Sequence, residues 1–163
     1  RLKRQKMITA LILVSQGVAF LHAGQEFNRT KDGDHNSYMS PDSTNKLDWD
    51  RKDEYIETVE FVKGFIKLRK ELKALRLNTA EEIKKHVFVR SLEKRVLEYT
   101  ISDVAEYGPY EEIKIFINPT HTSIDVKLND DYQLIANQNG VLAKATTINH
   151  LTVDAVELVV LAK

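Results

Sequence analysis

The residues best suited to do chemistry in this sequence lie in a polar segment between positions 23 and 52. The carboxylates that it offers include Glu26, Asp32, Asp34, Asp42 and Asp48. Hydrolysis of a glycosidic bond needs two carboxyl groups that flank the bond, about 5–5.5 Å apart when the configuration is retained. Composition alone does not show that any two of these carboxylates converge, and carboxylates in a loop are most often only solvated.

The same segment carries side chains that suit a sugar ligand. Tyr38 and Trp49 can stack on the apolar face of a pyranose ring. Asn36, Asp42 and Asn45 can exchange hydrogen bonds with the ring's hydroxyl groups. For Trp49 we favour the simpler interpretation, in which the indole pins the segment to the rest of the protein. The pattern indicates carbohydrate binding without identifying a catalytic pair.

Other catalytic motifs are missing or incomplete. The sequence has no GxSxG turn for a serine nucleophile and no phosphate loop of the GxxxxGK or GxGxxG type. His22 and Glu26 lack the second histidine of an HExxH zinc site. We therefore expect His22, at the end of an apolar run, to be a hydrogen-bonded core residue.

Residues 32–36 imitate the start of a calcium-binding loop. The EF-hand pattern then requires glycine at its sixth position and glutamate at its twelfth, where this sequence has Ser37 and Ser43. A polar turn is the better interpretation, and an irregular calcium site stays open as a weaker one. We expect no cofactor and no metal site.

Composition and charge argue against several classes of protein. The 163 residues hold 24 Lys and Arg against 24 Asp and Glu, so the formal net charge is zero and nucleic acid is not an expected partner. The absence of cysteine excludes disulfides, thiol catalysis and cysteine-ligated metals. No apolar run reaches the roughly 20 residues of a membrane span. The compartment stays open between the cytoplasm and the outside.

The elements that position the polar segment are predicted on both sides of it. A broad apolar surface over residues 1–16 predicts a mostly buried helix, which Gly17 ends in a left-handed conformation. The apolar run Val18–His22 predicts a strand covered on both faces, as in a parallel sheet. Such a strand needs neighbours that would have to precede Arg1, so the chain is expected to be a fragment.

A change of hydrophobic period divides the rest of the chain. A second helix is predicted from about Asp53 to Leu75, capped by Asp50 or Asp53, and Thr79 is a candidate cap for a short helix. From residue 86 the period becomes two. Strands are predicted at 87–89, 96–101, 113–117, 124–128, 132–135 and 156–160, with turns at 108–109, 118–119, 129–131 and 139–140. This pattern is typical of a small antiparallel β-sandwich, which begins after a boundary near Asn78.

Several motifs of the polar segment resemble one known family. The run SQGVAFLHAGQEF at 15–27 resembles the eighth barrel strand of type I pullulanases, in the α-amylase superfamily. The motifs RTK at 29–31, NSY at 36–38, SPD at 40–42, Asn45, and LDW at 47–49 resemble the loop after that strand. The resemblance implies an α/β region followed by an all-β region. Residues 1–78 would be the C-terminal portion of a (β/α)8 TIM barrel, and residues 79–163 a C-terminal β-sandwich domain.

The resemblance also implies an activity for the longer protein. That activity is hydrolysis of α-1,6-glucosidic branch links in pullulan, amylopectin and limit dextrins, with retention of configuration. The family's catalytic Asp, Glu and Asp follow barrel strands four, five and seven, upstream of this chain. No residue here is therefore given a catalytic role, and the chain alone is expected to be inactive. The expected partner is an α-glucan, and the expected source is bacterial.

Four residues of the loop are expected to line or shape the glucan cleft: Arg29, Tyr38, Asp42 and Asn45. Arg29 or Lys31 could instead hold the loop through salt bridges to Asp34 or Asp48. Glu26 does not match a catalytic glutamate of the family, and we expect it to fix the loop by hydrogen bonds.

Two other roles stay open for this chain. The β-rich region could be a non-catalytic carbohydrate-binding module that uses aromatic residues such as Tyr107 and Tyr110, or a purely structural cover for the barrel. Its aromatic residues are scattered along the sequence, which favours the structural role. In a fragment, the apolar run from Val18 to Leu21 would expose strand edges. That exposure predicts self-association or disorder of the N-terminal residues.

Overall fold

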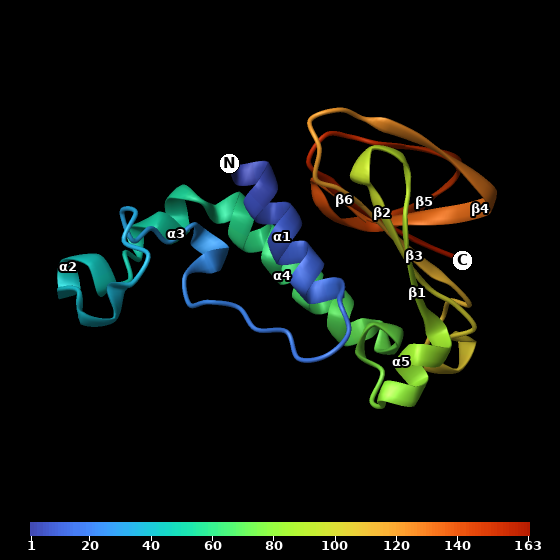
Figure 1. Cartoon of the computed structure of the whole chain (residues 1–163), viewed down its shortest axis with the longest axis horizontal. Helices are drawn as coiled ribbons and strands as arrows, with labels where there is room; N and C mark the ends of the chain where they lie inside the picture. Colours follow the sequence, from blue (N-terminus) through green and yellow to red (C-terminus); the bar gives the residue numbers. More distant parts are fainter.

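The computed structural model describes residues 1–163, apart from the side chain of Lys94. Two longer helices, α1 (Leu2–Val14) and α4 (Ile56–Glu71), lie side by side and next to a sheet (Figure 1). The segment between them carries only short elements, η1 (Gln25–Phe27), η2 (Ser37–Met39), α2 (Asp42–Asn45) and α3 (Asp50–Glu54). The later short helices are η3 (Lys73–Arg76), α5 (Ala80–His86), η4 (Glu93–Arg95) and η5 (Ala105–Tyr107).

The first predicted helix is confirmed as α1 and packs against α4. Met7 and Leu13 of α1 are buried in the same apolar cluster as Phe61 and Phe65 of α4, whose rings have their centroids 4.8 Å apart. Burial of large apolar side chains on both helices supplies most of the driving force for their association. Gly17 has a φ of 86°, in the left-handed region, where the chain turns away from α1.

The second predicted helix is interrupted at Tyr55. Neither Asp50 nor Asp53 caps α4, because its N-terminal flanking residue is Tyr55, whose side chain makes no capping hydrogen bond. The predicted cap at Thr79 is confirmed: its hydroxyl accepts a hydrogen bond from the Glu82 amide at 3.1 Å. The Glu82 carboxylate accepts one from the Thr79 amide at 2.9 Å in return. This reciprocal pair fixes the start of α5.

Residues 87–162 form one six-stranded sheet of order β1-β2-β3-β6-β4-β5, in which every neighbouring pair is antiparallel. The strands are β1 (Val87–Ser91), β2 (Leu97–Ile101), β3 (Ile113–Asn118), β4 (Ile124–Asn137), β5 (Gly140–Val153) and β6 (Glu157–Ala162). The antiparallel β architecture is therefore as predicted from residue 87 onward.

The predicted and observed strands differ in two places. The predictions at 124–128 and 132–135 fall on one strand, β4, whose register shifts between Lys127 and Tyr132. The turn predicted at 129–131 is therefore wrong, because these residues form the bulge inside β4. Strand β5 was not predicted at all, although the turn before it was: Gly140 has a φ of 120° at the β4–β5 turn. Most side chains of β5 lie outside the core, so the strand lacks the apolar alternation that marks the others.

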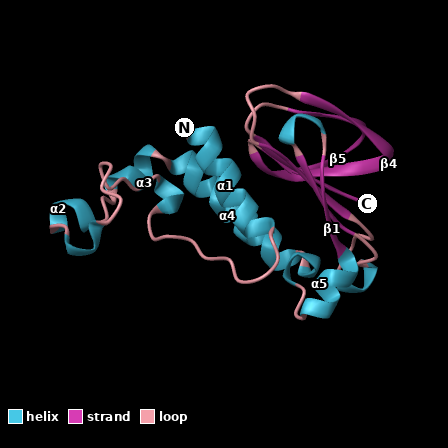
Figure 2. Cartoon of the chain, in the orientation of Figure 1, coloured by secondary structure: helices cyan, strands magenta, loops and turns pink.

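The two faces of strands β3 and β6 contact different apolar clusters. Ile113 and Ile115 of β3 belong to the cluster that includes α1 and α4. Phe116 belongs to a second cluster, together with Tyr132 and Leu151. The first half of β4 packs against this second cluster, so the far part of the sheet curls back over the near part (Figure 2). The predicted two-layered sandwich is thus a single hydrogen-bonded sheet that folds over itself at the bulge in β4.

The predicted parallel strand at Val18–His22 is wrong. These residues form no strand, and all paired strands of the described residues are antiparallel, so the structure contains no portion of a (β/α)8 barrel sheet. An isolated parallel strand has no neighbour to satisfy its backbone hydrogen bonds. Val18 is 99% exposed and Phe20 is 80% exposed. His22 is exposed as well, so its predicted place in the core is also wrong.

Residues before and after position 78 share one apolar core. The cluster on the helical side of the sheet joins Leu13 and Phe65 to Leu158 and Val160. In the part of the chain that the structure describes, no helix has the length and apolar character needed to cross a membrane. The division of the chain into domains near Asn78 stays a prediction.

Candidate functional site

The polar loop begins in a tight turn at Gly24. This residue has a φ of 87°, and its carbonyl oxygen accepts hydrogen bonds from the amides of Phe27 at 3.2 Å and Arg29 at 2.9 Å. A Cβ atom at position 24 would lie 2.8 Å from the Cβ of Arg29. Glycine is therefore required here for both conformation and space, and the turn sets the direction in which Arg29 leaves the backbone.

The side chain of Asn45 connects several parts of the loop by hydrogen bonds. Its amide nitrogen donates to the carbonyl oxygens of Ser37 at 2.9 Å and Ser40 at 2.7 Å. Its side-chain oxygen accepts from the ammonium of Lys31 at 2.5 Å, and Lys31 also donates to the Ser37 hydroxyl at 2.9 Å. Asn45 therefore ties α2 to η2 and uses its polar atoms within the protein.

Arg29 and Asp34 also hold the loop together. The Arg29 guanidinium donates to the carbonyl oxygens of Asn45 and, at 3.4 Å, Ala23. The Asp34 carboxylate accepts from the Ser40 hydroxyl and from the Asn36 amide. These two hydrogen bonds, with the charge of Lys31 as a smaller cause, lower the pKa of Asp34. Arg29 thus bonds to carbonyl oxygens, in place of the salt bridges to Asp34 or Asp48 considered from the sequence.

The side chains best placed to contact a ligand lie on the exposed surface of this hydrogen-bonded loop. Tyr38 is 90% exposed and its neighbour Met39 is 89% exposed. Asp42, the first residue of α2, is exposed too. Trp49 is 63% exposed, and its ring centroid lies 5.7 Å from that of the buried Phe27. The indole therefore both pins the loop to the protein, as the sequence favoured, and keeps a free face.

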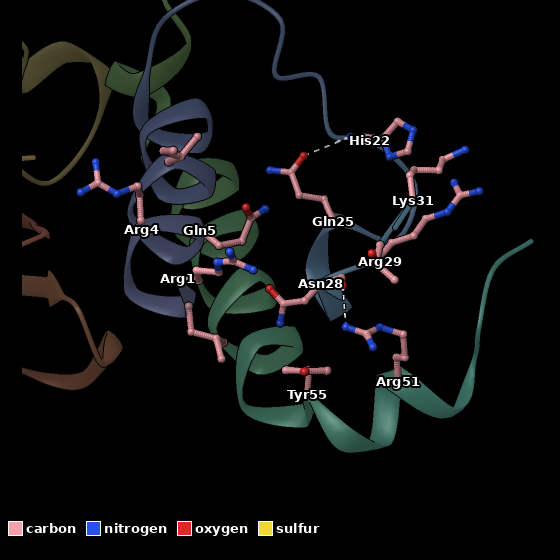
Figure 3. A pocket seen from close by; sticks show the side chains of 13 residues that line it. Arg1, Arg4, Gln5, His22, Gln25, Asn28, Arg29, Lys31, Arg51 and Tyr55 are labelled. Atoms are coloured by element: carbon pink, nitrogen blue, oxygen red, sulfur yellow. Dashed lines mark hydrogen bonds between the residues drawn. The ribbon is translucent and has the colours of Figure 1, made fainter. Parts of the chain in front are cut away.

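A cleft of about 810 Å³, the basic cleft, separates the loop from the start of α1 (Figure 3). It is lined by Arg1, Leu2, Arg4, Gln5, Ile8, His22, Gln25, Asn28, Arg29, Thr30, Lys31, Arg51 and Tyr55. Arg51 donates to the carbonyl oxygen of Asn28 at 2.8 Å, and its guanidinium carbon lies 4.8 Å from the centre of the Tyr55 ring. Sequence reasoning missed this cleft because its walls come from segments far apart in the chain.

Glu26 lines a separate hollow of about 510 Å³, together with Phe27, Trp49 and apolar residues of α4. Its carboxylate makes no hydrogen bond to any described residue, so its predicted role in fixing the loop is wrong. Among the residues whose side chains are described, no group of three or more His, Asp or Glu could hold a metal ion.

The sequence of this chain is similar to that of several known proteins. Residues 83–140 match the model of the pullulanase all-beta domain. The chain is 37% identical over 147 residues to the pullulanase of Bacillus subtilis, a match that covers 89% of this chain and 20% of that protein. It is 28% identical over 139 residues to the chloroplastic isoamylase 1 of Arabidopsis thaliana, covering 78% of this chain and 17% of the relative.

Solved structures agree with this assignment. The type I pullulanase of Bacillus subtilis complexed with maltose matches with a TM-score of 0.91 and 35% identity, over 99% of this chain and 23% of that one. The pullulanase of Anoxybacillus sp. LM18-11 complexed with maltotetraose matches with a TM-score of 0.89 and 33% identity, again over 99% and 23%. The chain therefore shares the sequence and the fold of one class of proteins, the debranching enzymes, over nearly its whole length.

Within that class, the chain belongs to the pullulanase family. It spans about a fifth of the length of the relatives that it matches over most of its own residues.

Proposed function

We propose that this chain supplies part of the α-glucan-binding face of a pullulanase-type enzyme. The longer protein hydrolyses α-1,6-glucosidic branch links in pullulan, amylopectin and limit dextrins, with retention of configuration. Residues 1–78 adjoin the catalytic (β/α)8 barrel of that protein, and residues 79–163 form its C-terminal β domain. The exposed apolar side chains of Val18 and Phe20, which have no cover in this chain, support contact with a further domain.

The observation that carries the proposal is an exposed tyrosine on a hydrogen-bonded frame. Tyr38 is 90% exposed, and Asn45 is hydrogen-bonded to Ser37, which precedes Tyr38 in η2, and to Ser40, which follows the end of η2. A rigid frame lowers the entropy lost when an aromatic ring stacks on a sugar. Tyr38 and Asp42 would touch the glucan, whereas Arg29 and Asn45 would shape the cleft from behind.

Relatives of known structure support a glucan as the ligand. Two of the matched pullulanase structures are complexes with maltose and maltotetraose. The chain alone is proposed to be inactive, because the resemblance to the family assigns none of its residues to the catalytic Asp, Glu and Asp, and hydrolysis requires a pair of carboxyl groups at the scissile bond.

For the β domain, a structural role is better supported than sugar binding. Tyr107 and Tyr110 both pack against the cluster between the sheet and the helices. The Tyr107 hydroxyl also donates to the Glu82 carboxylate at 2.9 Å. Aromatic rings held in this way have less free face for stacking on a pyranose, so we propose that this domain chiefly stabilises its neighbour.

Calorimetric titration of the chain with maltotetraose tests the proposal. Tyr38→Ala should weaken binding by about five- to a hundredfold, since loss of the buried area and the stacking of an aromatic ring costs on the order of 1–3 kcal/mol. Phe88→Ala is the matched control, because Phe88 is 54% exposed but lies on β1. Equal affinity of both variants and the parent chain would reject the assignment of Tyr38. Release of reducing sugar from pullulan by the chain alone would reject its inactivity.

A further inference from the structure

Positive charge gathers in the basic cleft although the chain as a whole has no net charge. Its described lining contains no Asp or Glu, but it contains the cationic side chains of Arg1, Arg4, Arg29, Lys31 and Arg51. Figure 3 shows Arg29, Lys31 and Arg51 on the loop and α3 side, across from Arg1 and Gln5, whereas Arg4 points away from the loop. The loop cations are therefore the ones to consider as a binding site.

These three cations have only neutral hydrogen-bond partners. Arg29 and Arg51 donate to backbone carbonyl oxygens, and Lys31 donates to a hydroxyl and an amide oxygen. The salt bridges of the described residues all lie elsewhere, on α4 and in the sheet. All three side chains are half-buried, so their charges are less screened by water than those of fully exposed residues.

Unpaired donors occur at the same place. The Nε atoms of Arg29 and Arg51 and the side-chain nitrogen of Asn28 are buried and have no hydrogen-bond partner. Buried polar groups without a partner are rare in folded proteins and cost free energy. All three residues line the basic cleft. Cations without a salt bridge and unpaired donors therefore coincide in one cleft, and an anionic acceptor would satisfy both.

We propose that the basic cleft binds a phosphate monoester carried by a glucan. Guanidinium groups present planar, paired donors that match the oxygens of a phosphate, and an ammonium adds a compact charge. The cleft volume of about 810 Å³ accommodates a sugar phosphate, and Ile8 and Tyr55 offer apolar surface to the ring.

The position of Lys31 connects this cleft to the glucan-binding loop. Its ammonium contacts Ser37 and Asn45, which hold the turn that presents Tyr38. A glucan at Tyr38 could therefore extend toward the cleft. The inference rests on the proposed glucan-binding function for the source of the phosphate, whereas the anion site itself requires no glucan.

Calorimetric titration of the full chain at low ionic strength tests the proposal, with inorganic phosphate, glucose 6-phosphate and glucose as probes. Both phosphates should bind and glucose should not, and binding should weaken at about 0.5 M salt because charges are screened. Stronger binding of glucose 6-phosphate than of inorganic phosphate supports a sugar-borne group. The opposite order, or absence of binding by both phosphates, would overturn the proposal.

Variants of two adjacent residues localise the site. Arg51→Gln should weaken phosphate binding by about ten- to a hundredfold, since a charge-assisted hydrogen bond is lost. Lys52→Gln removes a cation from the exposed neighbour, which lines the other hollow, and should leave binding unchanged. Arg51→Lys keeps the charge and should restore much of the affinity even if the packing around position 51 is disturbed. Equal losses in the Arg51→Gln and Lys52→Gln variants would contradict the assignment to this cleft.

The two proposals fail in different ways. If the parent chain does not bind maltotetraose, the glucan proposal is overturned. Binding of inorganic phosphate would still test the anion site. Phosphate binding that is abolished by Tyr38→Ala and unaffected by Arg51→Gln would place the anion at the loop tip, and would overturn the site proposed here.

Discussion

The guanidinium of Arg69 donates a hydrogen bond to the carbonyl oxygen of Leu13 at 2.8 Å, across the interface between α4 and α1. The same group also donates to the carbonyl oxygens of Ser15 at 2.7 Å, Gly17 at 2.5 Å and Leu75 at 3.1 Å. The last carbonyls of a helix have no partner within it and carry partial negative charge, which a cation neutralises. Arg69 thus closes the C-terminal end of α1 and holds the start of the extended segment.

Replacement of Arg69 should destabilise the whole chain. Arg69→Met keeps the apolar stem but leaves several buried carbonyl oxygens without a donor, so we expect a loss of about 2–4 kcal/mol in the free energy of unfolding. Urea denaturation followed by circular dichroism measures this change. Lys70→Met, at the exposed next position, is the control and should stay within about 0.5 kcal/mol of the parent. Matching effects at the two positions would contradict the role given to Arg69.

The start of α5 should make stability depend on pH through Glu82. Hydrogen bonds from the Tyr107 hydroxyl and from the amide and hydroxyl of Thr79 lower the pKa of this carboxyl. A carboxyl group with a lowered folded-state pKa stabilises the fold at pH values above its unfolded pKa of about 4.3. That contribution is lost as the pH falls through the folded-state pKa.

Comparison of Glu82→Gln with the parent chain tests this dependence. The variant should have a lower melting temperature at pH 7, and the difference should vanish below the folded-state pKa, where both side chains are neutral. Glu81→Gln changes the same charge in the same helical turn and should not reproduce the effect. A pH-independent difference between Glu82→Gln and the parent would mean that ionisation is not its cause.

Replacement of Asn45 should loosen the polar loop without unfolding the protein. Asn45→Ala deletes the hydrogen bonds to Ser37, Ser40 and Lys31. We expect a local loss of about 1–3 kcal/mol, seen as faster amide hydrogen exchange over residues 36–46 and weaker maltotetraose binding. Thr44→Ala is the control one residue earlier. Unchanged exchange in the Asn45→Ala chain would show that the loop is held by other contacts.

The exposed segment after α1 should cause self-association. Val18 and Phe20 present apolar side chains on an extended backbone that has no neighbouring strand, which is a template for pairing with a second copy. Sedimentation velocity over a range of concentrations should show reversible association that Phe20→Ser weakens. Met39→Ser, at another highly exposed apolar residue, should not. A chain that stays monomeric at the highest concentration would contradict this prediction.

Much of the fold follows from local patterns in the sequence. Helix α1 and the strands β1, β2, β3 and β6 were predicted because their apolar residues recur at the helical or the strand period. The cap at Thr79 and the turn at Gly140 were also predicted, because each depends on the chemistry of a few adjacent residues. The sequence also predicts sugar binding by the loop around Tyr38, and this stays a prediction.

The features that were predicted wrongly, or not predicted, depend on contacts between distant segments. Val18–His22 has the composition of a buried strand but no neighbouring strand to pair with in this chain, whereas β5 lacks a regular apolar alternation and is a strand because β4 pairs with it. The basic cleft likewise exists only because the loop carrying Arg29 and the start of α1 face each other. Hydrogen-bond pairing and the meeting of remote side chains are properties of the tertiary structure, so no local period records them.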